Sequence, residues 1–380
     1  MKPDTAACER QNATAETFSE GPATVGGSRE TQPFFSVVVP CYKVAPYLDA
    51  MAASVKNQPF ADWECILSYE ESPDATLAGC EALAASDPRF RIVRGPCSGS
   101  PSTPRNRAFE VARGRYVIWL DGDDYLTDGI LATLADALRA HDEPDVLIGA
   151  LETATFSDAG ERLTSERKFG FAPEDDGRVF SGPDAMIRMM GFEALPFIGA
   201  QIFVCRADFL REKRISFIPG LRHEDEEWSP RVFYYAKRLL VLDRVLFVYC
   251  RRPGSIMSTQ AGAQALEHHV QVDRAIFAFH AGHEFPPALS RALAREALSL
   301  FFFHFFYPSR QAGIPQKDRI RCLNDFLEGD GLGNFRRLAR FGSVPKRIGA
   351  GLVALVRISP CLGRLAFAYF KYAYYPLAMR

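Results

Sequence analysis

The stretch RYVIWLDGDDY, at Arg115–Tyr125, joins a short apolar run to three carboxylates. The run Arg115–Leu120 is aromatic and β-branched, the pattern of a strand buried on both faces. Asp121, Asp123 and Asp124 follow it directly. Like charges a few ångströms apart raise one another's pKa, so three ionised carboxylates indicate a bound cation. Oxygen ligands suit Mg²⁺ or Mn²⁺, which bridge to substrate phosphates. The alternative is a solvated turn, since Asp and Gly are common turn residues.

Apolar runs and helical segments alternate on the N-terminal side of this stretch. Such alternation predicts an α/β fold with a mostly parallel, doubly wound sheet and flanking helices. In these sheets, ligands bind beyond the carboxyl ends of the strands. The expected strands are 35–40, 63–68, 90–93 and 116–120, and the expected helices are 45–57, 75–86 and 103–113.

Aromatic and acidic groups follow two more of these strand ends. Pro40-Cys41-Tyr42 ends the first strand, and Glu70 and Glu71 follow the second. Tyr42 can stack on a base, and the two glutamates can accept hydrogen bonds from a base or ribose. A nucleoside diphosphate with a divalent metal is the simplest ligand for all three features. The alternatives are an ordinary loop tyrosine and a solvated acidic turn.

The sequence pattern is less regular over residues 141–200. A strand is expected at 145–149, a polar loop at about 157–176, and ordered structure again at 199–204. The acidic run at 223–228 opens a helix that continues to about residue 237, and a strand follows at 245–249. We therefore expect a disordered tail over 1–33, an α/β domain over 34–260 and a mainly helical region over 261–380, in which 288–307 is strongly aromatic.

Composition excludes several classes of protein. The 380 residues allow two domains, and the formal net charge of −1 argues against a nucleic-acid binder. The nine cysteines are scattered and form no CxxC pair, which indicates neither a disulfide framework nor a zinc site and fits a reducing cytoplasm. No apolar run approaches the roughly 18 residues of a transmembrane helix.

The C-terminal segment is basic and apolar. Residues 331–380 contain no Asp or Glu, and nine Lys and Arg lie among aromatic and aliphatic residues from 335 to 380. Such a segment is typical of contact with an anionic membrane surface, where each cation contributes about 1 kcal/mol. The alternative is a helical subdomain that packs on the catalytic core or, in a homo-oligomer, on a second subunit.

Six blocks, in order along 35–258, resemble the inverting nucleotide-sugar glycosyltransferases of family 2, which have the GT-A fold. The resemblance is strongest to enzymes that make bacterial capsule, exopolysaccharide or lipopolysaccharide. The blocks are FSVVVPCYKVAPYL at 35–48, SVKNQPFADWECIL at 54–67, PRNRA at 104–108, WLDGDDYL at 119–126, HEDEEW at 223–228 and YCRRPGSIM at 249–257.

The resemblance implies a role for each matching residue. Asp123 would be the main ligand of Mn²⁺ or Mg²⁺, with Asp121 near the metal or the ribose, and Asp225 would be the catalytic base. Asp124, Glu224 and Glu226 would support them. The residues implied to bind the nucleotide-sugar are Pro40, Tyr42, Glu70, Arg105, Asn106, Asp121, Arg251, Arg252 and Ser255.

The implied chemistry requires these residue types. Inversion needs a carboxylate to take the proton of the attacking hydroxyl, which Asp225 can do. The departing diphosphate accumulates negative charge that a divalent ion and arginines such as Arg252 stabilise. The alternative for the acids at 224–227 is a helix N-terminus, where each contributes about 0.3–1 kcal/mol by complementing the helix dipole. Both interpretations are compatible.

The chain departs from the family pattern in three places. The acidic turn reads YEES instead of VDDGS, Lys43 replaces an Asn, and Ala108 replaces a Gly. The turn leaves the base open, with uridine favoured. We expect transfer from a nucleoside-diphosphate sugar to a glycan or lipid-linked acceptor, in the cytoplasm at the inner face of the membrane. The alternatives are a catalytically silent scaffold and a sugar nucleotidyltransferase, although the latter generally has a glycine-rich phosphate loop after the first strand, and this chain does not.

Overall fold

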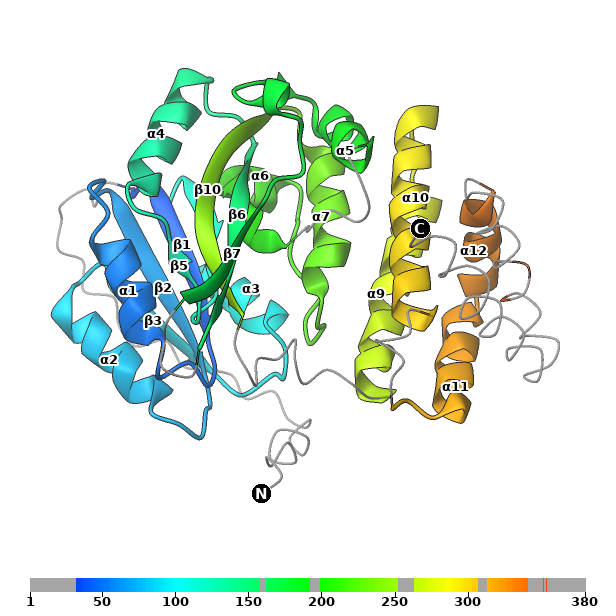
Figure 1. The fold of residues 1–380 in the computed structure, drawn as a ribbon, viewed down its shortest axis with the longest axis horizontal. Helices are drawn as coiled ribbons and strands as arrows, with labels where there is room; N and C mark the ends of the chain where they lie inside the picture. Colours follow the sequence, from blue (N-terminus) through cyan, green and yellow to red (C-terminus); the bar gives the residue numbers. More distant parts are fainter. Residues whose placement is uncertain are drawn as a thin grey trace.

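The computed structural model describes residues 32–157, 162–191, 199–251, 263–306 and 313–340, together with 351 and 353. One ten-stranded sheet has the order β3-β2-β1-β4-β9-β6-β10-β5, with β7 paired to β6 and β8 to β10 (Figure 1). The strands are β1 Phe35–Cys41, β2 Trp63–Glu70, β3 Phe90–Gly95, β4 Tyr116–Trp119, β5 Tyr125–Leu126, β6 Val146–Phe156, β7 Arg162–Lys168, β8 Val179–Phe180, β9 Phe203–Arg206 and β10 Leu239–Arg251.

The first half of the sheet is parallel, as the sequence predicts. Val38 of β1 is in register with Ile66 of β2 and with Trp119 of β4. Every residue of β2 and β4 is buried, and β1 is buried except for the partly exposed Pro40. Strands covered on both faces need apolar side chains throughout, which explains their unbroken apolar runs.

The second half of the sheet is mixed. β9 lies between β4 and β6 and is antiparallel to both, whereas β6 and β10 are parallel to each other. The predicted doubly wound parallel arrangement therefore holds for only part of the sheet. An apolar run indicates that a strand is buried and carries no information about its direction.

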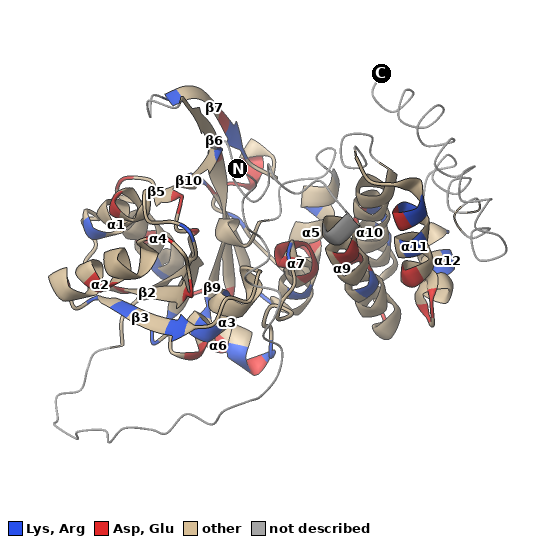
Figure 2. Ribbon diagram, turned by 90° about the horizontal axis from the view of Figure 1, so that it is seen from below, with Lys and Arg blue, Asp and Glu red and all other residues tan. Residues whose placement is uncertain are grey.

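The expected polar loop at 157–176 is partly wrong. β7 pairs antiparallel with β6 and forms a ribbon that extends away from the sheet (Figure 2). Six of the seven residues of β7 are exposed. A strand without a buried face has no apolar alternation, so its sequence resembles a loop. β6 and β10 also extend well beyond the expected 145–149 and 245–249.

Helices cover the sheet and continue beyond it. α3 packs on β1 and β2, and α7 stands between the sheet and the helices α9 and α10 (Figure 1). The α-helices are α1 Leu48–Lys56, α2 Thr76–Ser86, α3 Ser102–Glu110, α4 Ile130–Ala140, α5 Gly182–Gly191, α6 Ala207–Glu212, α7 Glu224–Tyr235, α9 Ala263–Gly282, α10 Pro287–Phe306, α11 Gln316–Leu327 and α12 Gly331–Ala339, with 3₁₀ turns at Pro173–Asp175 and Ala200–Ile202.

Two hydrophobic cores account for this arrangement. The larger core surrounds the sheet and includes Leu289 and Leu293 of α10. The second core joins α9, α10, α11 and α12 through aromatic side chains such as Phe301 and Phe326. Because α10 contributes to both cores, the helical region is packed against the sheet domain.

The start of the basic segment is part of the second core. Phe335 and Leu338 of α12 are fully buried there. Residues 1–31 of the tail predicted at 1–33 and most of the segment at 335–380 lie outside the described residues. Among the helices that the structure describes, none is both long enough and apolar enough to cross a bilayer.

Candidate active site

The carboxyl ends of β2, β1 and β4 meet at one edge of the sheet. A Cβ atom on Gly122 would lie 3.0 Å from the carbonyl oxygen of Pro40 and 3.1 Å from a methyl of Val44. The acidic turn after β4 therefore rests closely on the loop after β1, and any side chain at position 122 would press on that loop. Tyr42, partly exposed, lies in that loop. The convergence expected from the sequence is confirmed.

Hydrogen bonds fix the loop that carries Tyr42. Lys43 has φ +55°, a left-handed conformation that Asn adopts more readily than Lys. Its amide nitrogen donates to Ser72 Oγ at 2.9 Å, and the next amide, of Val44, donates to Thr76 Oγ1 at 3.0 Å. These bonds join the loops after β1 and β2 and hold Lys43 in a conformation that its side chain disfavours.

Glu70 is the buried last residue of β2. Its carboxylate accepts hydrogen bonds from Ser98 Oγ at 2.7 Å and from the Ser98 amide at 3.3 Å, and it lies 3.5 Å from Arg107 Nη2. Burial raises the pKa of Glu70, while Ser98 and Arg107 oppose the rise. The carboxylate is thus engaged within the protein, and its contact with a nucleoside remains a prediction.

Arg105 links the acidic turn to the first turn of α7. Its guanidinium donates through Nη2 to Asp121 Oδ1 at 2.6 Å and through Nη1 to Glu224 Oε1. The Arg105 and Glu224 side chains are only 3% and 2% exposed. Burial alone would lower the pKa of Arg105, but Asp121 and Glu224 raise it, so the guanidinium stays charged. One buried cation therefore holds together two predicted acidic motifs.

Gln201 is a site residue that the motifs did not reveal. Its Nε2 donates to Asp121 Oδ2 at 2.6 Å, so both carboxylate oxygens of Asp121 accept a hydrogen bond from a protein side chain. The sequence feature that could have indicated it is the single amide side chain in the apolar run at 199–204.

The other two acids of the turn differ from each other in exposure. Asp123 is partly exposed, whereas Asp124 is 1% exposed and accepts a hydrogen bond at 2.8 Å from the amide of Cys250, near the end of β10. Asp124 therefore supports the site by fixing β10. Burial raises the pKa of neighbouring Tyr249, and the negative charges of Asp124, Asp121 and Asp123 add to the effect.

The oxygen donors of this turn fit a hard divalent cation. Carboxylates are the ligands that Mg²⁺ and Mn²⁺ prefer, and only one or two are needed when phosphates complete the coordination. Asp124 is buried against β10, and Asp121 is hydrogen-bonded to Arg105 and Gln201. Asp123 is partly exposed, and its role as the main metal ligand, with Asp121 beside it, remains a prediction.

The first turn of α7 carries four consecutive acids. It follows His223, whose φ is +58°. Asp225 is partly exposed, and its Oδ1 accepts a hydrogen bond from the Glu226 amide at 3.1 Å. Burial raises the pKa of Asp225 well above its usual value, and Glu224 and Glu226 raise it further. A carboxylate with a raised pKa is a stronger proton acceptor.

The remaining predicted residues fall into three groups. The side chain of Asn106 donates to the carbonyl of Phe217 at 2.8 Å and accepts from its amide at 3.0 Å, so it braces the segment before α7. Its nucleotide contact remains a prediction. Arg251 is exposed at the end of β10, and Arg252 and Ser255 lie outside the described residues. Glu226 pairs with His304 of α10 at 3.2 Å.

Comparisons with known proteins identify related sequences. Residues 36–211 match the sequence model of glycosyl transferase family 2. The chain is 25% identical to the uncharacterized glycosyltransferase EpsJ of Bacillus subtilis, over 63% of this chain and 67% of that protein. It is 28% identical to the glycosyltransferase GlyG of Streptococcus pneumoniae, over 59% and 73% of the two chains.

A solved structure shares the fold. The structure of residues 1–349 of S. aureus TarS in complex with UDP matches with a TM-score of 0.64 and 18% identity, over 89% of this chain and 91% of that one. TarS has also been solved in complex with UDP-GlcNAc, with a TM-score of 0.62. At this identity the likeness establishes the common fold alone.

Proposed function

Because this chain belongs to glycosyl transferase family 2 and is a glycosyltransferase, we propose that it transfers a sugar, with inversion, from a UDP-sugar to a hydroxyl of a glycan or lipid-linked acceptor in bacterial surface polysaccharide synthesis. The observation that carries the proposal is the bridge from Asp121 through Arg105 to Glu224. It sets the acidic turn beside the helix end that bears Asp225.

The donor is held at the sheet edge in this proposal. Tyr42 stacks on the base, and Asp123 holds a divalent ion with Asp121 beside it. When bound, Mn²⁺ or Mg²⁺ would neutralise charge on the diphosphate. The choice of UDP is supported by the complexes of TarS with UDP and UDP-GlcNAc.

Asp225 accepts the proton of the acceptor hydroxyl. Two features support this role, the partial exposure of its side chain and the raised pKa. Glu224 is less suited to it, because it is 2% exposed and paired with Arg105. The buried Arg105 keeps Glu224 in place, so the two acids have separate tasks: one holds the helix end and the other carries out proton transfer.

Two variants of the full chain test the donor site and the base separately. Asp123→Ala should abolish the metal-dependent part of UDP binding in calorimetry, and Asp225→Asn should abolish sugar transfer while UDP binding stays within about twofold. The matched control is Asp136, an exposed acid of α4. Asp136→Ala and Asp136→Asn should leave UDP binding and sugar transfer unchanged.

The results also separate the enzyme from a silent scaffold. UDP affinity that is equal with and without Mn²⁺ and in Asp123→Ala would contradict the donor site. Transfer that persists in Asp225→Asn would assign the base to another group. UDP binding without hydrolysis or transfer for any nucleotide sugar, in the wild-type chain, would favour the scaffold.

The proposed location at the inner membrane surface rests on the sequence of the basic segment. Since Phe335, Leu338 and Val353 belong to the second core, the suitable truncation is after residue 353. We expect this truncation to release the protein from vesicles containing anionic lipid. Equal sedimentation of the truncated and full chains with the vesicles would argue against membrane contact.

A further inference from the structure

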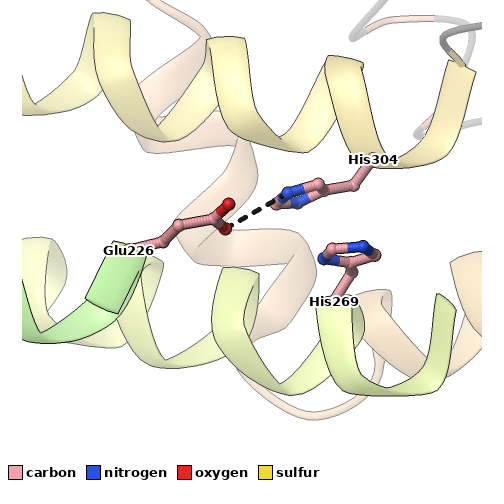
Figure 3. A group of neighbouring side chains, drawn as sticks. All are labelled: Glu226, His269 and His304. Carbon is pink, nitrogen blue, oxygen red and sulfur yellow. Dashed lines mark ion pairs between the residues drawn. The ribbon is translucent and has the colours of Figure 1, made fainter. Parts of the chain in front are cut away.

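Three side chains from three helices meet where α7 packs against the helical region. Glu226 comes from α7, His269 from α9 and His304 from α10 (Figure 3). Each offers one ligand atom, and the three atoms lie within 4.8 Å of one another. The closest pair is Glu226 Oε2 and His304 Nε2, at 3.2 Å. Nothing in the glycosyl transfer proposed above requires imidazoles at this position.

A fourth residue orients one of the two histidines. Both carboxylate oxygens of Asp273, on α9, lie 3.2 Å from His304 Nδ1. Asp273 and His304 have fully buried side chains. In the neutral imidazole, a hydrogen bond from Nδ1–H to Asp273 leaves the lone pair on Nε2, which faces Glu226. A carboxylate behind the far nitrogen of a histidine is the usual outer partner of a metal-binding imidazole.

The charges at this junction also favour a divalent cation. Glu226 and Asp273 bring two carboxylates to His304, and their side chains are 20% and 0% exposed. A protonated His304 would compensate one negative charge. A divalent ion bound by neutral histidines would compensate both, which matters because an uncompensated buried charge is costly.

We propose that Glu226, His269 and His304 bind a divalent transition-metal ion of the Zn²⁺ class, with Asp273 as a positioning residue. Two imidazoles and one carboxylate are a known protein ligand set for zinc, which takes its fourth ligand from water. Zinc–ligand bonds of about 2.0–2.2 Å require the three atoms to approach to about 3.3 Å. The 3.2 Å pair already meets this spacing.

Binding requires one rearrangement that the structure defines. The rings of His269 and His304 are stacked, with centroids 3.9 Å apart and an angle of 15° between their planes. Lone pairs lie in the ring plane, so one ring must turn out of the stack for both nitrogens to reach one ion. His223 stacks on His269 at 4.5 Å. Because Asp273 holds His304 in place, we expect His269 to be the ring that turns, and its contact with His223 to change on binding.

This site is chemically distinct from the acidic turn at the sheet edge. Imidazole nitrogen suits zinc, whereas an all-oxygen set suits Mg²⁺ or Mn²⁺. The ion would join α7 to α9 and α10 one residue after Asp225. The helical region would then be held to the helix that carries the proposed base, whatever sugar is transferred.

The test measures zinc content in the full chain, without a histidine tag. After chelator treatment, reloading with ZnCl₂ and desalting, elemental analysis should find about one zinc per chain. His269→Ala and Glu226→Gln should each lower the zinc affinity at least 100-fold in a competition with a chromophoric chelator. Asp273→Asn should weaken it about 10–100-fold, the effect typical of an outer partner. His141→Ala, at the remote end of α4, and Asp123→Ala are the matched controls and should keep the native stoichiometry.

Cobalt gives a second, spectroscopic readout. Co²⁺ in place of zinc should produce visible d–d absorption that is lost in His269→Ala, provided that circular dichroism shows a native fold. Glu226→Gln tests the same point with a partly exposed residue if His269→Ala does not fold. Less than about 0.1 zinc per folded wild-type chain, or equal zinc affinity in the wild type and both ligand variants, would overturn the proposal. The cluster would then be an ion pair between imidazolium and carboxylates.

Discussion

Replacing Arg105 by methionine should destabilise the protein strongly. Methionine keeps the apolar stem and removes the guanidinium, so Glu224, which is 2% exposed, loses its cationic partner. Breaking a buried ion pair by removing one partner typically costs about 3–5 kcal/mol. Each kcal/mol lowers the Tm of a domain of 150–250 residues by about 2–4 °C. We therefore expect Arg105→Met to lower the Tm by about 6–20 °C.

A second substitution tests the cause of the loss. If the cost arises from an uncompensated carboxylate, Glu224→Gln in the Arg105→Met background should restore part of the Tm, because the neutral amide no longer needs the cation. The exposed pair Arg94–Glu81 is the matched control, with side chains 58% and 51% exposed. Arg94→Met should cost at most about 1 kcal/mol.

Differential scanning calorimetry of the three variants and the wild type measures these shifts. Two results would refute the reasoning. One is a Tm for Arg105→Met equal to that of Arg94→Met. The other is a double variant, Arg105→Met with Glu224→Gln, no more stable than Arg105→Met alone. The first result would mean that the bridge contributes little to the folded state, and the second that the loss does not arise from an uncompensated Glu224 carboxylate.

Three further predictions concern other parts of the sheet. Burial alone would raise the pKa of Glu64, but hydrogen bonds from Ser36 and neighbouring donors lower it. The contribution of Glu64 to stability is therefore present above its unfolded pKa and is lost as pH falls through the folded pKa. Glu64→Gln should flatten the dependence of the Tm on pH between about pH 6 and 3, and an unchanged pH profile would contradict this. Gly114→Ala would place a Cβ 2.4 Å from the Ser36 backbone nitrogen and should lower stability by about 1–3 kcal/mol in denaturant unfolding, whereas a native midpoint would show that the backbone yields easily. Asp124→Ala would leave the Cys250 amide without its acceptor and should cost about 1–3 kcal/mol, measured by calorimetry, with no loss expected if that amide finds another partner.

The parallel half of the sheet was predictable because its physics is local. The runs that form β1 and β4 are buried on both faces, so each carries its own signal. β7 carries no such signal because it is almost wholly exposed, and the direction of β9 depends on its neighbours.

The site was predictable as a set of motifs, but its internal contacts were not. The sequence order of Asp121 and Glu224 gives no hint that Arg105 binds both. His304 stands out in the run FFFHFF as the one polar residue among phenylalanines, yet its partners come from two other helices. Pairings between residues distant in sequence require the folded chain.

The position of β10 has a consequence for how the protein is made. β10 is the last strand of the sheet in sequence, yet it lies between β6 and β5. Until Leu239–Arg251 leaves the ribosome, one edge of β6 and the short β5 have no partner on that side. An open strand edge invites pairing with another chain. The emerging protein therefore passes through an interval in which the sheet is unclosed, and the chain closes it with its own final strand.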